Sequence, residues 1–309
     1  MKKFLMTSLV ALAALSASPA MAQKPTCDAK CLTGIAQDYM KGLVAHEYKD
    51  LPWGDHVGFT ENAVSINIGE SLWGAVTAAQ DDPYIAADPE SGNVFWFGVV
   101  EEHGLPAYYG MRLKVEDKAI TEVETTLGRQ GVPGAFQPAD GYRVDRIFSQ
   151  TVPEKSRSPR EKLIAIVDGY FNTKQLNDGT LYTQFDDKCE RVINGASTTS
   201  GEDHWAAKAA KGCAHQLQIG LYKPVDRIRE RRFPVVDEAR GVVVALSMVD
   251  HASRYVTYKT TDGKEQQMPI EYPNTLGLME VFKIIDGKIV RIEGVQSFLP
   301  YFMKTRWGH

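Results

Sequence analysis

The chain has 309 residues, of which 43% are hydrophobic and 24% charged, and its formal net charge at pH 7 is −4. This composition is typical of a globular protein, and the length suits two domains of ordinary size. A slightly acidic chain in which no basic face dominates argues against a nucleic-acid partner. The densest basic run, 227–232, has four arginines that alternate in part with Ile228 and Glu230, so we expect a solvated strand edge there.

The N-terminus has the pattern of a secretory signal peptide. Two lysines precede an apolar run over 4–15, and the small-residue cleavage pattern AMA follows at 20–22. An apolar run of about a dozen residues is too short to span a bilayer. We therefore expect residues 1–22 to be removed, leaving a periplasmic or secreted protein that begins at Gln23 and has no membrane partner after signal removal.

The four cysteines fit an oxidising compartment. Three disulfide pairings can be drawn. We favour Cys189–Cys213, which brackets an insert, and Cys27–Cys31 as a local bridge at the start of a helical pattern. No Cys-x-x-Cys pair and no histidine at ligand spacing is present, so we predict no metal site.

The first half of the chain reads as one helix followed by strands. Asp28 is a suitable N-cap for a helix over 29–47, in which apolar residues recur at helical spacing. Strands are then predicted over 57–62, 64–68, 94–101, 107–115 and 120–127. Residues 129–158 are rich in Gly, Pro and charge without a sustained period, which is typical of a linker.

The second half repeats this order. Residues 158–161, Ser-Pro-Arg-Glu, have the pattern of a capping box that opens a second helix. In that helix Tyr170 stands 131 positions after Tyr39. Strands are predicted over 185–194 and 242–251, and a tight reversal at Asp286-Gly287 joins the strands of a closing hairpin over 277–294.

The closing hairpin occurs twice. Residues 110–124 and 277–294 share a frame of Lys, Asp, Ile, an apolar residue and Glu, with the two copies 169 residues apart. Val99–His103 also lines up with Ser247–His251. Such repeats indicate a duplicated domain. The predicted fold class is α+β, with two tandem cone-shaped domains over 27–128 and 159–303, each a curved, mainly antiparallel sheet wrapped against helices.

Three features resemble the nuclear transport factor 2-like superfamily, specifically its SnoaL-like branch. They are the helix end at Ala45-His46, the segment D-x-V-x-F-T-E-N over 55–62, and the D-G-K-I-x-R-I-E of the closing hairpin. The stretch RRFPVVDE at 231–238 looks like exported proteins that carry two such domains in tandem, a family whose function we cannot state. The resemblance covers most of 27–303.

The resemblance implies a fold rather than a reaction, because the superfamily includes isomerases, cyclases, dehydratases, lyases and non-enzymatic binding modules. Enzymes that resemble this fold usually work without cofactors, using Asp, His, Tyr or Arg in an apolar cone, so no cofactor is expected. The sequence also lacks the G-x-S-x-G, H-E-x-x-H, P-loop and G-x-G-x-x-G signatures.

His251 is the first candidate for chemistry. Neighbours on a strand point to opposite faces, and His251 shares the parity of the apolar residues 243–249, so we expect it rather than Asp250 to enter the cone. Asp250 is kept as a substrate-binding candidate. The alternative is that His251 ends its strand and hydrogen-bonds a turn.

Glu280 interrupts an apolar strand, and a carboxylate near the core must be paired, catalytic or turned to water. Arg231 could bind a substrate carboxylate or pair with Glu280. Tyr170 lies on the helix stripe, where it could orient a substrate or simply belong to the core.

The loop Asp203-His204-Trp205, together with His215, could rim a pocket, with Trp205 stacking on an aromatic ligand, or could be solvated. His56, Glu61, Arg112 and the pair Glu102-His103 are weaker candidates in the first half.

The sequence thus favours an exported, cofactor-independent lyase, dehydratase or isomerase that acts on a small, partly apolar, aromatic molecule by general acid–base chemistry. His251 would be the base, Glu280 the acid or its partner, Arg231 an anion clamp and Tyr170 an orienting hydroxyl. The alternative is a non-catalytic periplasmic ligand-binding or assembly module whose cone is filled by side chains. The partner is a small-molecule substrate, and a homodimer is left open.

Overall fold

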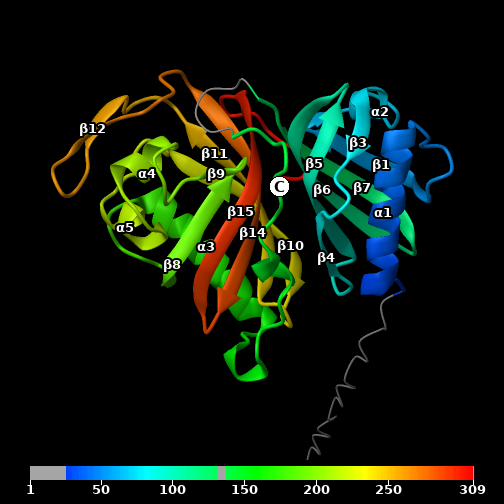
Figure 1. The fold of residues 1–309 in the computed structure, drawn as a ribbon, viewed down its shortest axis with the longest axis horizontal. Coiled ribbons are helices and arrows are strands. Elements are labelled where there is room, and N and C mark those ends of the chain that lie inside the picture. Colours follow the sequence, from blue (N-terminus) through cyan, green and yellow to red (C-terminus); the bar gives the residue numbers. More distant parts are fainter. Residues whose placement is uncertain (1–25, 131–136, 309) are drawn as a thin grey trace, which may run out of the picture.

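The computed structural model describes residues 26–130 and 137–308, so the predicted signal peptide lies outside the described residues. Two curved sheets pack back to back, and each is covered on its other face by one long helix (Figure 1). The first half of the chain forms the right-hand sheet of Figure 1, and the second half forms the left-hand sheet. The predicted α+β class with two curved, mainly antiparallel sheets is confirmed.

The first half contains one long helix and a seven-stranded sheet. Its elements are α1 (Ala29–Ala45), β1 (Trp53–Glu61), β2 (Val64–Ser65), α2 (Leu72–Ala75), β3 (Val76–Ala79), β4 (Tyr84–Asp88), β5 (Asn93–Glu102), β6 (Leu105–Glu116) and β7 (Ala119–Gly128). The strand order is β2-β1-β7-β6-β5-β3, with β4 also paired to β5. Asp28 caps α1 as predicted, because its Oδ1 accepts the Cys31 N–H at 2.9 Å.

The second half contains one long helix, a six-stranded sheet and a separate small hairpin. Its elements are η1 (Arg146–Ser149), η2 (Glu154–Ser156), α3 (Arg160–Leu176), β8 (Phe185–Ile193), β9 (Ala196–Ser197), α4 (Trp205–Ala209), α5 (Cys213–Gln218), β10 (Arg227–Asp237), β11 (Val242–His251), β12 (Thr257–Lys259), β13 (Glu265–Gln267), β14 (Asn274–Ile285) and β15 (Lys288–Pro300). The predicted capping box does not form: Pro159 is the N-cap of α3, and Glu238 accepts the Arg160 N–H instead.

The two halves follow the same plan. Helices α1 and α3 both have 17 residues and begin 131 positions apart, at residues 29 and 160. In both halves the strand after the helix runs parallel to the last strand of the closing hairpin, so that Phe59 lies opposite Val123 and Arg191 opposite Ile292. All other strand pairs in the two large sheets are antiparallel.

Strand register corrects the repeat alignment by one residue. Asn93 lies opposite Lys114 in the first half, and Val242 lies opposite Lys283 in the second. The residue equivalent to His251 is therefore Glu102, not His103. His103 lies in the following turn with a φ of 50°.

Both faces of the second sheet are buried. Along β11, Val242, Val244 and Leu246 face the first sheet, whereas Val243 and Ala245 belong to the core under α3. Every residue of β11 is consequently buried. A strand covered on both faces reads as a continuous apolar run, which is why parity alone does not show which face meets the helix.

Polar contacts also join the halves. The Arg232 guanidinium donates to both oxygens of Glu124 at 2.8 and 2.6 Å. At the C-terminus the Trp307 Nε1–H donates to Thr60 Oγ1 at 2.8 Å, and the Arg112 guanidinium lies 5.0 Å from the Trp307 ring centroid. The end of the chain is thereby fixed to the first half.

The basic run at 227–232 is not the solvated edge that its composition predicts. Arg229, Arg231 and Arg232 are all half-buried, and each is paired with a carboxylate. A guanidinium that leaves bulk water needs such a partner.

Both predicted disulfides are present, and none of the four cysteines is free. Cys27–Cys31 lies at the start of α1, while Cys189–Cys213 ties β8 to α5 across the insert that carries α4. None of the described helices is long and apolar enough to cross a membrane.

We predict that replacing Cys189 and Cys213 together by alanine lowers the free energy of unfolding by about 3 kcal/mol, because the bridge restrains a long loop of the unfolded chain. Urea unfolding without reductant measures this loss. The matched control is the Cys27→Ala/Cys31→Ala pair, whose sequence separation of 4 compares with 24 for the first bridge, so its loss should be smaller. A larger loss in the control pair would refute the prediction.

Candidate functional site

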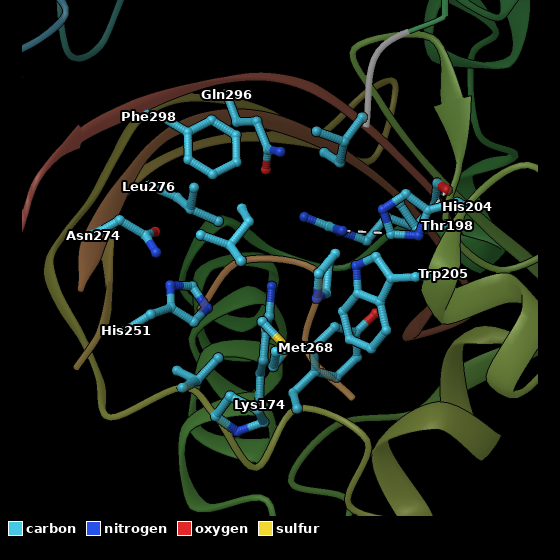
Figure 2. Close-up of a pocket in the computed structure, with 17 residues that line it drawn as sticks. Lys174, Thr198, His204, Trp205, His251, Met268, Asn274, Leu276, Gln296 and Phe298 are labelled. Atoms are coloured by element: carbon cyan, nitrogen blue, oxygen red, sulfur yellow. Dashed lines mark hydrogen bonds between the residues drawn. The ribbon is translucent and has the colours of Figure 1, made fainter. Parts of the chain in front are cut away.

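A cavity of about 680 Å³, including the open space at its mouth, lies in the second half between α3, the concave face of the sheet and the insert (Figure 2). Much of the wall is apolar or aromatic: it includes Trp205, Tyr222, Met268, Leu276 and Phe298. A few polar side chains enter from different elements, and they give the cavity its chemical character.

Lys174 is the central polar group. It comes from the last turn of α3, its side chain points into the cavity in Figure 2, and the residue is 5% exposed. Its Nζ lies 4.9 Å from the Tyr222 ring centroid. Within the described ranges the ammonium has neither a hydrogen-bond acceptor nor a carboxylate in contact. Burial, reinforced by the positive charge of Arg191 and only partly opposed by Glu280, lowers the pKa of Lys174 from 10.5 to about 7.

A buried ion pair lies at the back of the cavity. Arg191 on β8 donates from Nε and Nη2 to the same oxygen of Glu280 on β14, at 3.0 and 2.8 Å. Glu280 is 1% exposed and Arg191 7%. The two charges offset each other, so the pair presents little net charge to a ligand. Taking two charges out of water carries a desolvation cost, which the attraction between them must offset.

His251 and Asn274 form a polar corner of the cavity. They lie directly opposite each other on β11 and β14. The His251 Nδ1 and the Asn274 Oδ1 are both buried and have no hydrogen-bond partner among the described residues. Because buried polar atoms are normally paired, this corner is complementary to a hydroxyl group or a water molecule. Burial and the charge of Lys174, opposed by Asp250, lower the pKa of His251 to about 4, so its ring is neutral at pH 7.

His204 and Trp205 close the cavity from the insert. The Ala206 N–H donates to His204 Nδ1 at 3.1 Å, which makes His204 the N-cap of α4 and leaves Nε2 to carry the ring proton. Burial and the charges of Arg191 and Lys174 lower the pKa of His204 to about 4. Trp205 contacts Tyr222 edge to face at 6.2 Å between ring centroids. This part of the wall is aromatic and carries two N–H donors, the His204 Nε2–H and the Trp205 Nε1–H.

Of the residues proposed from the sequence, His251, His204 and Trp205 line the cavity. Glu280 does not line it but pairs with Arg191, which does. Tyr170 is packed in the core with its ring centroid 5.3 Å from that of Phe282, and burial raises the pKa of its hydroxyl.

The other three lie elsewhere. Arg231 binds Asp168 and Asn172 on α3, at 3.0 and 2.6 Å, and not Glu280. Asp250 points away from His251 and accepts hydrogen bonds from Arg229 at 2.9 and 3.1 Å. His215 is exposed on α5. None of these three side chains lines the cavity, because Arg231 is held by α3, Asp250 faces Arg229 and His215 faces solvent.

Lys174, Arg191 and Asn274 are the site residues that sequence reasoning missed. A signal for Lys174 exists: it stands three and four positions after Phe171 and Tyr170, on the buried stripe of its helix. No comparable signal marks Arg191 or Asn274, because their roles depend on which strands are neighbours.

In the first half, buried apolar side chains occupy the positions equivalent to the polar wall of the cavity. The plan shared by the halves places Leu43 where Lys174 lies, Phe59 where Arg191 lies and Met111 where Glu280 lies. All three are buried apolar residues of the first core. The fold can therefore be built without charges at these positions, which indicates that the second half keeps them for a purpose other than folding.

The candidates of the first half are engaged in other contacts or in solvent. The Arg112 guanidinium donates to Glu124 and Asn93, at 3.0 Å each, and Glu61 accepts from Ser71. His56 is exposed. Within the described residues, no group of three or more His, Cys, Asp or Glu side chains is placed to hold a metal ion.

Residues 156–296, which include all of the lining residues of the cavity except Phe298, match a family described as a domain of unknown function, DUF8021. This match covers less than half of the chain. No curated protein matches the sequence.

Several solved structures are similar to part of the chain. A Bacillus subtilis protein named as an isomerase is 16% identical, with 44% of this chain and 87% of that chain covered and a TM-score of 0.30. A Xanthomonas campestris protein named as a polyketide cyclase is 17% identical over 45% and 92%, with a TM-score of 0.28. An NTF2-like protein from Cytophaga hutchinsonii is 13% identical over 45% and 99%, with a TM-score of 0.27. At these values the likeness carries no argument about the reaction.

We predict that Lys174→Leu, which installs the first-half residue, raises the free energy of unfolding by on the order of 2–5 kcal/mol at pH 6 to 7. The folded-state pKa of Lys174 is lowered to about 7. Between this value and 10.5 the unfolded chain binds more protons, so the stability of the wild type rises with pH. The free energy of unfolding of the variant should consequently exceed that of the wild type most below pH 7, and the difference should shrink toward pH 10. Urea unfolding of the wild type and the variant at pH 6 and at pH 10 measures this difference in stability.

The control for this prediction is Lys283→Leu. Lys283 is also buried, but its ammonium donates to the carbonyl oxygens of Gln150 and Arg240. Its removal leaves those two acceptors without their partner and should destabilise the protein. A Lys174→Leu variant that is as destabilised as Lys283→Leu would show that Lys174 has a structural partner.

We also predict a strong coupling between Arg191 and Glu280. Glu280→Met alone should cost about 3–5 kcal/mol, because it leaves a buried guanidinium unpaired. The double variant Arg191→Phe/Glu280→Met, which copies the first half, should recover the stability of the wild type to within about 1 kcal/mol. Urea unfolding of the four proteins completes the cycle. A double variant less stable than either single variant would contradict the assignment.

Proposed function

We propose that the second half is a cofactor-independent lyase, dehydratase or isomerase, which binds a small, partly apolar, aromatic molecule in the cavity and acts by general acid–base chemistry. The observation that carries the proposal is Lys174, an unpaired buried amine whose pKa of about 7 lets it take or give a proton near neutral pH. A catalytic group is most efficient when its pKa is close to the working pH.

In this proposal Lys174, rather than His251, is the leading base. A histidine with a pKa of about 4 is deprotonated at neutral pH but is a weak base. His251 instead orients the substrate by a hydrogen bond, together with the unpartnered Asn274 Oδ1. The expected pH dependence is therefore set by the lysine.

The walls indicate what kind of molecule fits. Trp205, Tyr222 and Phe298 offer flat apolar surface for an aromatic body. The corner of His251 and Asn274 suits a hydroxyl group. Because Glu280 already neutralises Arg191, the cavity offers no free guanidinium as an anion clamp. A neutral, hydroxylated aromatic compound meets these conditions.

Export to the periplasm or to the outside of the cell is part of the proposal. The N-terminal pattern supports it, as do the two disulfides, which persist in oxidising compartments. The alternative function is a non-catalytic ligand-binding or assembly module. It would use the same cavity without proton transfer.

Hydrogen exchange tests the proposal without knowledge of the natural substrate. Small aromatic ketones with a C–H next to the carbonyl are incubated with the protein in D2O, and NMR follows the loss of that C–H signal. We expect exchange that rises through about pH 7 as Lys174 loses its proton. Lys174→Met should lower the exchange rate by roughly 10²–10⁴, whereas His251→Gln should weaken exchange without moving the midpoint.

The matched control is His215→Gln, which changes an exposed histidine outside the cavity and should leave the rate unaltered. Ketones that bind the wild type without any exchange would favour the binding module. Exchange that survives in Lys174→Met would place the base elsewhere.

A further inference from the structure

Two buried lysines of the second half differ in how their ammonium groups are held. Lys283 donates to two backbone carbonyls, which is a structural use of the side chain. Lys174 has no such acceptor in the described part of the chain and points into an open cavity. A lysine that only stabilised the fold would be paired, so the free end of Lys174 is available to a ligand.

The surroundings of Lys174 favour an uncharged amine. Burial disfavours the charged form, and the positive charge of Arg191 on β8 adds to this effect while Glu280 opposes it in part. The Tyr170 and Tyr222 ring centroids, 6.0 and 4.9 Å from the Nζ, offer only a modest cation–π attraction to the charged form. His204 and His251 face the same space as neutral rings. An uncharged lysine amine has a free lone pair, and desolvation beside another cation is one of the ways in which proteins activate lysine toward carbonyl compounds.

We propose that Lys174 forms a covalent imine with the carbonyl carbon of a small aromatic aldehyde or ketone bound in this cavity. This inference rests on the proposed function and names its substrate class. The aromatic ring would lie against Trp205 and Tyr222, and a ring hydroxyl would meet His251 and Asn274.

The step balances without a cofactor. The Nζ lone pair forms a bond to the carbonyl carbon, and the π pair of the C=O bond moves to the oxygen, which takes up a proton. The nitrogen loses one proton to give the carbinolamine. Its hydroxyl group then takes up a second proton and leaves as water while the nitrogen lone pair forms the C=N bond, and the protonated imine that results can give up its remaining N–H proton. No electrons enter or leave, and the net reaction is amine plus carbonyl giving imine plus water. The protonated imine withdraws electrons from the neighbouring C–H, which makes the proton transfer of the proposed function easier.

Reductive trapping tests the inference. The full mature chain is incubated at pH 7 with 4-hydroxybenzaldehyde and sodium cyanoborohydride, which reduces an imine to a stable secondary amine. Peptide mass spectrometry then locates the adduct. We expect Lys174 to be labelled at least 10²-fold faster than exposed Lys188, because an ordinary lysine at pH 7 has a neutral fraction roughly 10³ times smaller. Lys174→Met should remove this adduct and leave the slow labelling of Lys188 unchanged.

Two further comparisons sharpen the test. Asn274→Leu should slow the trapping of 4-hydroxybenzaldehyde more than that of benzaldehyde, which lacks the hydroxyl group. In the His215→Gln variant, Lys174 should be labelled as fast as in the wild type.

Ligand binding, followed by saturation-transfer NMR, separates the two proposals. If 4-hydroxybenzaldehyde binds the wild type but Lys174 is labelled no faster than Lys188, the imine is refuted and acid–base chemistry in the cavity survives. If it neither binds nor labels Lys174, the imine and the proposed substrate class fall together. If the Lys174→Met variant still binds the aldehyde and is rapidly labelled at another residue, the assignment of Lys174 is also overturned.

Discussion

The back-to-back packing of the two sheets is the constraint on which the rest of the structure depends. It buries Val242, Val244 and Leu246 of β11 against Phe95 and Phe97 of the other half. Because side chains alternate along a strand, this contact also decides that the odd residues of β11 face α3 and the cavity. A slip of one residue in the pairing of β11 would turn its even residues toward α3 and its odd residues toward the first half. The interface between the halves thus fixes the direction of His251, although His251 touches no residue of that interface.

Much of the fold could be predicted because its signals are local. The cap at Asp28, the hairpin at Asp286-Gly287 and the two disulfides need only short-range patterns. Parity along β11 places His251 on the same face as Val243 and Ala245, but the packing of the two sheets decides which face that is. The partner of Glu280 could not be predicted, since Arg191 and Arg231 are both strand arginines and only the parallel pairing of β8 with β15 brings the right one near.

Two other errors have physical causes. A match of His103 to His251 is one residue out of register, because the chain already turns at His103 and Glu102 pairs with Leu105. Lys174 was overlooked because lysines on an apolar helix stripe commonly extend their ammonium to water. Here the insert, held by Cys189–Cys213, covers that exit and turns the same residue into the wall of a cavity.

The shared sheet interface has a consequence for the modularity of this chain. A family match that ends at residue 296 describes a unit whose convex sheet face is apolar and, in this protein, is covered by the other half. Such a unit on its own would expose that face to water and would need a second copy to cover it. Here the covering copy is supplied in the same polypeptide, and Trp307 fastens the chain end to it. An association that separate subunits would reach only above a threshold concentration has thereby become intramolecular, and it persists however dilute the protein is.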